Sequence, residues 1–437
     1  MHHSSTFNRL LIAAVVMLLM TATIAWGQFT GGNVVVLQIG DGITPLSSNS
    51  APVFLKEYTP SGTLVQTITL PSTGLSPRLT VTGTSTSEGH LIRSSDGNYL
   101  TLTGYDVVAG SSGFAVAGTP RVIARLNSAG TIDLTTALTD GGSGAVRSSV
   151  TDNGSNTWMT NSTVGLRYKA FGSSGASTQV TATPTNTRVV KIFNGQLYMT
   201  SGSGGFTCVN TVGVGTPTGS GNATSPLSGM PTASRSPYSF SISPDGNTMY
   251  VADDGSAASN GGIEKWTLSG GTWSNPYTLL NNGTTTTAVR GLTVDWSGTD
   301  PVIYATSSAN NLIKVTDTGS GSTATTIASA PASTAFRGVD FTPGVASTQY
   351  RSVASGNWNA TSTWESSTDG STWVAATATP TDADGAITIR NPHTVTVTAS
   401  VSADQVTIAS GATLHVNNLQ TLTIANGTGT VDNQDHL

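Results

Sequence analysis

Short stretches in which apolar and polar residues alternate run through almost the whole chain, and most of them end at a turn containing Gly. Residues 236–255, SPYSFSISPDGNTMYVADDG, are typical, because an alternating segment leads into an Asp-Gly turn and a second alternating segment follows. Alternation with a period of two predicts a β-strand with one buried face. Asp or Asn beside Gly favours a tight hairpin turn. The pattern therefore predicts an all-β protein built from hairpins.

The same hairpin recurs along the chain, at residues 88–104, 146–162, 187–202 and 289–307 as well. A second alternating pair follows several of these hairpins, as in residues 261–280 and 311–329. Each unit is therefore predicted to be a four-stranded meander. The units recur roughly every 40–55 residues, a spacing typical of β-propeller blades.

The two ends of the repeated region predict a ring that closes through a shared blade. The strand in GGNVVVLQIG, residues 31–40, and the pair after it lack a first strand, whereas TAFRGVDFTP, residues 334–343, is a strand without a blade of its own. Pairing between them would remove an open sheet edge. This count predicts a six-bladed propeller over residues 28–344, and a seventh blade would need a unit in the loop at 104–120.

A different pattern begins at Tyr350. Trp358, Trp364 and Trp373 fall close together, and short apolar rungs separated by Gly, Asn or Ser follow them. Such rungs predict a β-solenoid-like module over residues 345–437, which we expect to be truncated because no polar cap follows its last turn. The tryptophans could form a sugar-stacking platform or a core. The core is favoured, since burying a large aromatic side chain contributes about 1.5–3 kcal/mol.

Four phrases carry a resemblance to a known family: FLKEYTPSGTLVQTITLP, SEGHLIRSSDGNYLTLTGYD, MYVADDG and TAFRGV. They resemble secreted surface proteins of gliding bacteria that use type IX secretion, which carry an N-terminal propeller of unassigned role. The resemblance covers about residues 29–343 and implies a fold and a location, but no chemistry. The tail is similar to the β-helix-like modules that follow propellers in bacterial surface proteins.

The N-terminal segment predicts export. Arg9 precedes the apolar run of residues 10–25, and small residues lead to a cleavage site after Gly27, so residues 1–27 are predicted to be a signal peptide. The alternative is a retained membrane anchor; no other stretch could span a bilayer. We expect a secreted or cell-surface protein whose partner is an extracellular glycan or a surface protein.

Composition narrows the classes of function. Only 9% of residues are charged, the net charge is -5 and no basic run appears, so nucleic-acid binding is not expected. The single cysteine, Cys208, allows no internal disulfide and no cysteine-based metal cluster, and its alternating position predicts a small buried residue.

Arginine forms the strongest candidate binding constellation. Arg147, Arg188, Arg290 and Arg337 each lie at the start of a predicted inner strand, so they would ring one mouth of the propeller channel. Guanidinium groups bind carboxylate, sulfate or phosphate in a bidentate manner. In the structural alternative, each Arg bonds backbone carbonyls of the next blade and locks the ring. This alternative is favoured, because ligand sites rarely follow a repeat.

A metal-dependent enzyme is the second functional hypothesis. Glu88, Asp295 and Asp340 lie near the predicted channel, and residues 289–307 weakly resemble an inner strand of propeller lactonases, which hold a divalent cation there. The resemblance implies Ca²⁺ or another divalent cation and hydrolysis of a lactone or similar ester. The Asp-Gly phrases at 253–255 and 382–385 suggest calcium loops, although the glutamate of an EF-hand is missing.

Catalytic motifs are absent from the sequence: it contains no Gly-x-Ser-x-Gly, no His-Glu-x-x-His and no phosphate loop. The first hypothesis is therefore a non-catalytic binding or structural protein that needs no cofactor.

Overall fold

Within the described residues, the regular secondary structure is almost entirely β-strand. A computed structural model describes residues 27–344, 348–367, 373–382, 384–403 and 405–424. The two helical segments within these ranges are single 3-10 turns, η1 (Ala257–Ser259) and η2 (Thr361–Thr363). Neither of these described helices has the length and apolar character needed to cross a bilayer. The predicted signal peptide lies outside the described residues except for Gly27. The all-β prediction is confirmed.

Four antiparallel sheets each contain four strands in consecutive chain order, as predicted for propeller meanders. The first has β9 (Val146–Thr151), β10 (Asn156–Asn161), β11 (Leu166–Ala170) and β12 (Thr178–Thr181). The second has β13 (Thr187–Phe193), β14 (Gln196–Ser201), β15 (Val209–Val212) and β16 (Thr224–Pro226). The third has β17 (Pro237–Ile242), β18 (Thr248–Asp253), β19 (Gly262–Ser269) and β20 (Thr272–Leu279). The fourth has β21 (Val289–Asp295), β22 (Val302–Ser307), β23 (Asn311–Thr316) and β24 (Thr325–Ser329).

A nine-stranded sheet joins the two ends of this region. One part of it consists of β25 (Ala335–Phe341), β1 (Val34–Ile39), β2 (Ser50–Tyr58) and β3 (Leu64–Thr69). Another part consists of β5 (Ile92–Arg93), β6 (Tyr99–Tyr105), β7 (Arg121–Asn127) and β8 (Ile132–Leu138). The short strand β4 (Thr80–Thr82) pairs with both β2 and β6 and so connects the two parts.

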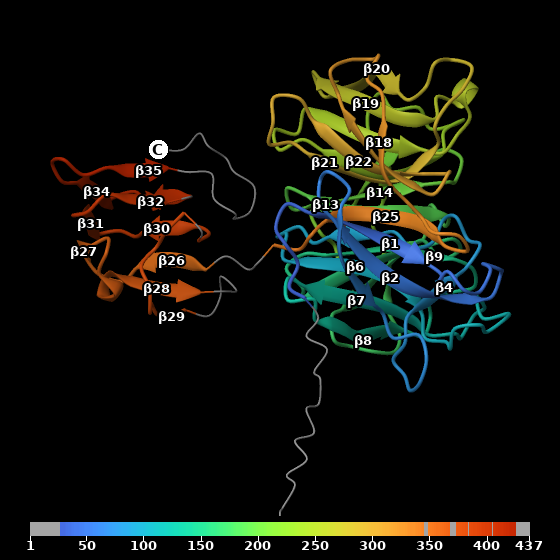
Figure 1. The fold of residues 1–437 in the computed structure, drawn as a ribbon, viewed down its shortest axis with the longest axis horizontal. Coiled ribbons are helices and arrows are strands. Elements are labelled where there is room, and N and C mark those ends of the chain that lie inside the picture. Colours follow the sequence, from blue (N-terminus) through green and yellow to red (C-terminus); the bar gives the residue numbers. More distant parts are fainter. Residues whose placement is uncertain (1–26, 345–347, 368–372, 383, 404, 425–437) are drawn as a thin grey trace, which may run out of the picture.

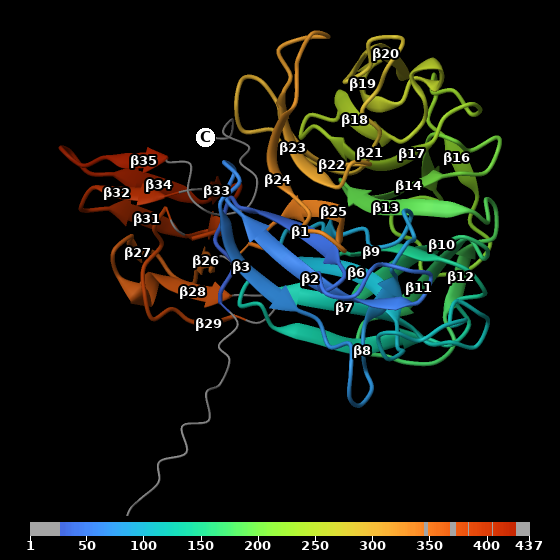
Figure 2. The same cartoon turned by 45° about the vertical axis from the view of Figure 1, so that its right-hand side comes forward.

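The predicted pairing between the distant ends is confirmed. β25 pairs antiparallel with β1, and Val339 lies opposite Val36 (Figure 1). The loop at 106–120 contains no strand, so no further meander lies there. The first strands of the meanders, called inner strands below, lie side by side: β9 contacts β5 and β13, β17 contacts β13 and β21, and β25 contacts β21 and β5. Figure 2 shows β9, β13, β17, β21 and β25 near the centre of this region. The inner strands therefore surround the centre of a propeller-like fold.

The apolar core lies between neighbouring sheets. One cluster combines Trp158 from β10, Val190 from β13 and Phe240 from β17, which belong to three successive sheets. Cys208 is buried in the same cluster, and burial raises the pKa of its thiol to about 12. The prediction of a small buried residue at this position is confirmed.

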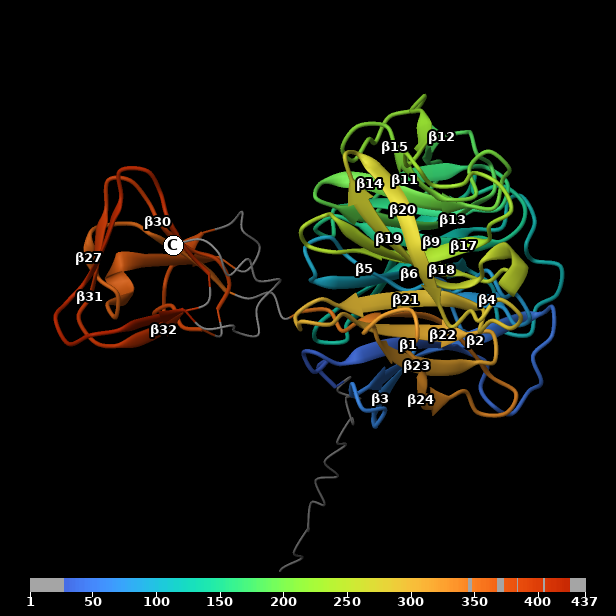
Figure 3. The ribbon, with the colours of Figure 1, turned by 90° about the horizontal axis from the view of Figure 1, so that it is seen from above.

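Parallel strands build the tail. One sheet pairs β26 (Gln349–Ser352), β30 (Ile387–Ile389) and β33 (Val406–Ile408), and a second pairs β27 (Gly356–Asn357), β31 (Thr394–Val397) and β34 (Thr413–Val416). A third pairs β32 (Val401–Ala403) with β35 (Leu422–Ile424), while β28 (Trp364–Ser367) and β29 (Val374–Ala375) extend the first sheet in antiparallel orientation. Figure 3 shows β30, β31 and β32 on three different sides of the tail.

Trp358 and Trp364 form the core of the tail. Each side chain is only 1% exposed, and their ring centroids lie 5.2 Å apart in an edge-to-face arrangement. The Trp358 indole N–H donates to the Pro380 carbonyl, and that of Trp364 donates to the Trp358 carbonyl. The core interpretation of these two residues is therefore confirmed, and neither presents a face to a sugar.

Candidate anion-binding site

The four predicted arginines all lie near the start of an inner strand. Arg147, Arg188 and Arg290 are the second residues of β9, β13 and β21, and Arg337 is the third residue of β25. Because the inner strands line the centre in the same direction, the repeat carries these side chains to one end of the channel. Two inner strands carry no arginine of this set: the second residue of β17 is Tyr238, and β5 is preceded by His90 and Leu91.

His90 lies among these side chains, two residues before β5. Its backbone N–H donates to the Arg147 carbonyl, and its ring stacks on Tyr238 with 5.5 Å between the centroids. The guanidinium carbons of Arg188 and Arg290 lie 4.2 and 5.7 Å from the Tyr238 ring centroid. Burial first, and then the charges of all four arginines, lower the pKa of His90 to about 3. The imidazole is therefore neutral at physiological pH.

Three of the arginines bond the neighbouring meander as the structural alternative expects. Arg147 Nη1 donates to the Thr187 carbonyl at 2.9 Å, and Arg188 Nη1 donates to the Pro237 carbonyl at 3.0 Å. The third contact runs from Arg337 Nε to the Ser85 carbonyl at 2.9 Å. The first two bonds connect adjacent inner strands, and the third connects β25 to the turn after β4, so all three stabilise the ring.

Arg290 departs from this pattern. Its Nε and Nη2 both lie 2.8 Å from a carboxylate oxygen of Asp254, and within the described ranges its guanidinium donates to no backbone carbonyl. A bond to a carboxylate is charge-assisted and stronger than a neutral one.

Each of the four arginines keeps one terminal amino group that has no hydrogen-bond partner among the described residues. These groups are Nη2 of Arg147, Arg188 and Arg337, and Nη1 of Arg290. The Nε atoms of Arg147 and Arg188 and both ring nitrogens of His90 are buried and also unpartnered. We call this set of four arginines, with His90 and Tyr238, the arginine mouth.

Glu88 lies beside the arginine mouth, and its carboxylate is used in hydrogen bonds within the protein. It is only 2% exposed and accepts hydrogen bonds from the Thr82 backbone N–H, the Thr82 hydroxyl and the Tyr105 hydroxyl. Burial raises the pKa of its carboxyl to about 7, although these donors and Arg147 lower it. Near neutral pH, Asp254 neutralises one of the four arginine charges, and Glu88, which is only partly ionised, neutralises less than one more. The arginine mouth therefore carries a net positive charge.

The other two acids of the metal hypothesis have partners of their own. Asp340 accepts hydrogen bonds from the Arg93 backbone N–H at 2.9 Å and the Thr293 hydroxyl at 2.8 Å, and Lys191 Nζ lies 3.9 Å from it. Asp295 accepts from the backbone and hydroxyl of Ser297. Within the described ranges, no group of three or more His, Cys, Asp or Glu side chains could hold a metal ion.

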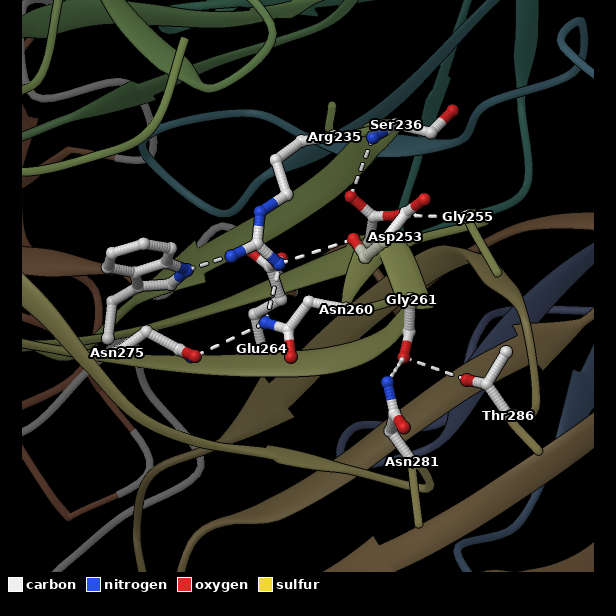
Figure 4. Close-up of polar contacts among 12 residues, drawn as sticks. Arg235, Ser236, Asp253, Gly255, Asn260, Gly261, Glu264, Asn275, Asn281 and Thr286 are labelled. Carbon is white, nitrogen blue, oxygen red and sulfur yellow. Dashed lines mark hydrogen bonds and ion pairs between the residues drawn. The ribbon is translucent and has the colours of Figure 1, made fainter. Parts of the chain in front are cut away.

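In the two predicted calcium loops, aspartate carboxylates also accept hydrogen bonds from groups of the protein. Asp253 accepts from the backbone N–H of Ser236 and of Gly255, as Figure 4 shows, while Asp254 pairs with Arg290. In the same close-up Arg235 contacts Glu264 at 2.7 Å. In the second loop, Asp384 accepts from the Thr381 backbone N–H.

Sequence reasoning missed two members of the arginine mouth. The signal for Tyr238 is its place in SPYSF, which matches that of Arg147 in AVRSS and Arg290 in AVRGL. The signal for His90 is weaker, because β5 has only two residues and begins after it.

No protein-family description matches the chain, and no curated protein matches it. Among solved structures, TolB from Acinetobacter baumannii is similar at 14% identity, with 71% of this chain and 68% of that chain covered and a TM-score of 0.42. The periplasmic gluconolactonase PpgL of Pseudomonas aeruginosa is similar at 13% identity, with 65% and 79% covered and a TM-score of 0.38. A candidate 6-phosphogluconolactonase from Bacteroides uniformis is similar at 13% identity, with 68% and 82% covered and a TM-score of 0.39. These identities and TM-scores are too low for any property of those proteins to be assigned to this chain.

Proposed function

We propose that this chain is a non-catalytic binding protein whose β-propeller holds an anionic ligand at the arginine mouth. The observation that carries the proposal is the set of four unpartnered terminal amino groups around a neutral, buried His90. Guanidinium groups that are already fixed by other bonds lose little side-chain entropy when they bind a carboxylate, sulfate or phosphate. The bonds that lock the ring thus also prepare the site.

We further infer that the propeller has six blades and closes through a shared blade. The nine-stranded sheet counts as two blades connected by β4, and β25 supplies the inner strand of the blade that contains β1. The parallel pairing of β26, β30 and β33, and of β27, β31 and β34, supports a β-solenoid-like module over residues 345–437.

The proposed setting is the bacterial exterior, reached by type IX secretion or a similar route. The predicted signal peptide and the charged fraction of only 9% support this setting. An acidic group of an extracellular glycan or of a surface protein is the partner that suits a cationic site there. The lactonase-like alternative draws no support from Glu88, Asp295 and Asp340, which have separate protein partners.

Thermal unfolding with and without sulfate or citrate tests the proposal. At about ten times the Kd, a bound anion should raise the Tm of the wild type by about 2–4 °C. The Arg290→Gln variant should lose most of this rise, whereas Arg78→Gln, which removes an arginine paired with Asp106 away from the mouth, should keep it. A wild-type Tm that neither anion changes would contradict the proposal.

A further inference from the structure

Arg290 differs from the other arginines of the mouth in the group that holds it. A carboxylate oxygen of Asp254 lies 2.8 Å from both its Nε and its Nη2, whereas Arg147, Arg188 and Arg337 bond backbone carbonyls. The Asp254 side chain is 13% exposed and that of Arg290 is 20% exposed. A contact through two nitrogens fixes the plane of a guanidinium group, and it therefore also fixes the direction of the third nitrogen, Nη1.

Asp254 is itself held in place by the backbone around it. Its N–H donates to the Ser236 carbonyl at 3.2 Å. The buried carboxylate of Asp253 accepts from the Ser236 N–H at 2.8 Å and from the Gly255 N–H at 2.7 Å (Figure 4). Asp254 therefore presents its carboxylate from a backbone segment that the protein fixes in the absence of a ligand.

The same segment contacts the neighbouring arginine of the mouth. Arg188 Nη1 donates to the Ser236 hydroxyl at 2.9 Å and to the Pro237 carbonyl at 3.0 Å. Arg188 and Arg290 both lie near the ring of Tyr238, with guanidinium carbons 4.2 and 5.7 Å from its centroid. Their unpartnered amino groups, Nη2 of Arg188 and Nη1 of Arg290, do not belong to the buried unpartnered atoms, so a ligand can reach both.

The charge of Asp254 and the position that it imposes act on anion binding in opposite directions. Its negative charge offsets one of the four arginine charges and repels an anion. Its bonds to Arg290 remove side-chain freedom that an unheld arginine would lose on binding. Loss of the carboxylate therefore tightens binding if charge dominates, and weakens it if positioning dominates.

Resting on the proposed function, we propose that Asp254 is a positioning residue of the arginine mouth, which holds Arg290 so that Nη1 is available to the anion. Asp254 acts through Arg290 and does not contact the anion itself. Both side chains are partly exposed, so water and salt screen the repulsion between Asp254 and an anion, whereas the freedom of an unheld arginine is not reduced by salt. Positioning therefore outweighs charge.

Titration calorimetry with citrate on the full chain tests this role. Asp254→Ala should weaken citrate binding by at least about fivefold, although it raises the net positive charge of the mouth. Asp254→Asn, which loses the charge but keeps an oxygen that can accept from Arg290, should bind within about twofold of the wild type. The matched control, Asp106→Ala, removes an acid that pairs with Arg78 away from the mouth and should leave the Kd unchanged.

A second substitution shows whether Asp254 acts through Arg290. In the Arg290→Gln background, which weakens citrate binding by itself, Asp254→Ala should cause no further loss, because the side chain that Asp254 positions is gone. A general loss of structure would instead weaken binding equally in both backgrounds. Asp254→Ser, whose hydroxyl is too short to reach Arg290, should behave as Asp254→Ala does and covers the case in which the Ala variant does not fold.

The outcomes separate this inference from the proposed function. If citrate binds the wild type and Arg290→Gln weakens it, but Asp254→Ala tightens binding or leaves it unchanged, the arginine mouth binds anions and Asp254 does not position Arg290. Equal losses from Asp254→Ala in the wild type and in Arg290→Gln also overturn the inference. If neither citrate nor sulfate binds the wild type, the proposed function is wrong and this inference is wrong with it.

Discussion

Arg147 and Arg188 show that one guanidinium group can stabilise a ring of strands and remain available to a ligand. Each uses Nη1 to bond the next meander and leaves Nη2 without a partner among the described residues, while its Nε is buried. This is chemically reasonable because arginine carries five N–H donors in a fixed plane. The structural and the ligand-binding interpretations of the sequence are therefore compatible at these residues.

Glu88 should make the stability of the protein depend on pH. Its pKa in the folded state is raised to about 7 from 4.5, so the folded state holds the proton more tightly than the unfolded state does. The free energy of unfolding should thus fall as the pH rises from about 4.5 through 7, by up to about 3 kcal/mol from this group. Denaturant unfolding of Glu88→Gln across this range should show a smaller fall than the wild type.

Glu264 provides a comparison for this measurement. Burial also raises its pKa to about 7, and Arg235 lowers it. The double variant Glu88→Gln/Glu264→Gln should therefore be less dependent on pH than either single variant. Parallel pH profiles for Glu88→Gln and the wild type would show that the Glu88 carboxyl is not perturbed in solution.

At the scale of elements, the alternation of apolar and polar residues was enough to predict a strand wherever that strand has one face in the core. The hairpins β9–β10, β17–β18 and β21–β22 lie where the sequence predicted them. β4 was missed because three residues, Thr80–Thr82, cannot show a period, and its pairing with β2 and β6 depends on tertiary packing. His90 was missed for a similar reason, since its position follows from the neighbours of β5 and not from the short strand itself.

The close approach of β25 to the segment before β5 leads to a prediction about Gly338. A Cβ atom at this position would collide with the backbone nitrogen of Leu91 and lie 2.8 Å from the Gly89 carbonyl oxygen. Gly338→Ala should therefore lower the free energy of unfolding by roughly 1–3 kcal/mol, as overpacking typically does.

The matched control for this variant is Gly204→Ala. No heavy atom lies within 4 Å of a Cβ placed there, so its free energy of unfolding should stay within about 0.5 kcal/mol of the wild type. Equal stability of the two variants in denaturant unfolding would mean that β25 and the segment at 89–91 are not in contact in solution.

At the scale of the whole molecule, the described strand pairs fall into two separate groups. Every pair among β1–β25 stays within residues 34–341, and every pair among β26–β35 stays within residues 349–424. The change of pattern at Tyr350 predicts two domains, over residues 28–344 and 345–437. The parallel arrangement of the tail was also expected, whereas the antiparallel addition of β28 and β29 was not, because it depends on the packing around Trp364.

A fragment of residues 28–344 should fold without the tail. Its last residue, Gly344, donates a backbone hydrogen bond to the Gly97 carbonyl, so the cut leaves the described sheets intact. The fragment should unfold in one cooperative transition and bind citrate with the Kd of the full chain. Circular dichroism and calorimetry would measure both, and a fragment without β-structure would show that the tail is needed for folding.

The connection through β4 determines where such a ring can come apart. A ring closed only by one pairing between its first and last strands would open most readily at that junction. Here the strand that receives the closing partner belongs to a sheet that also extends into the adjacent unit through β4. If the β25–β1 pairing opened, β4 would still hold β2 to β6, so separation of the chain ends should stay confined to that one junction and leave the two units joined.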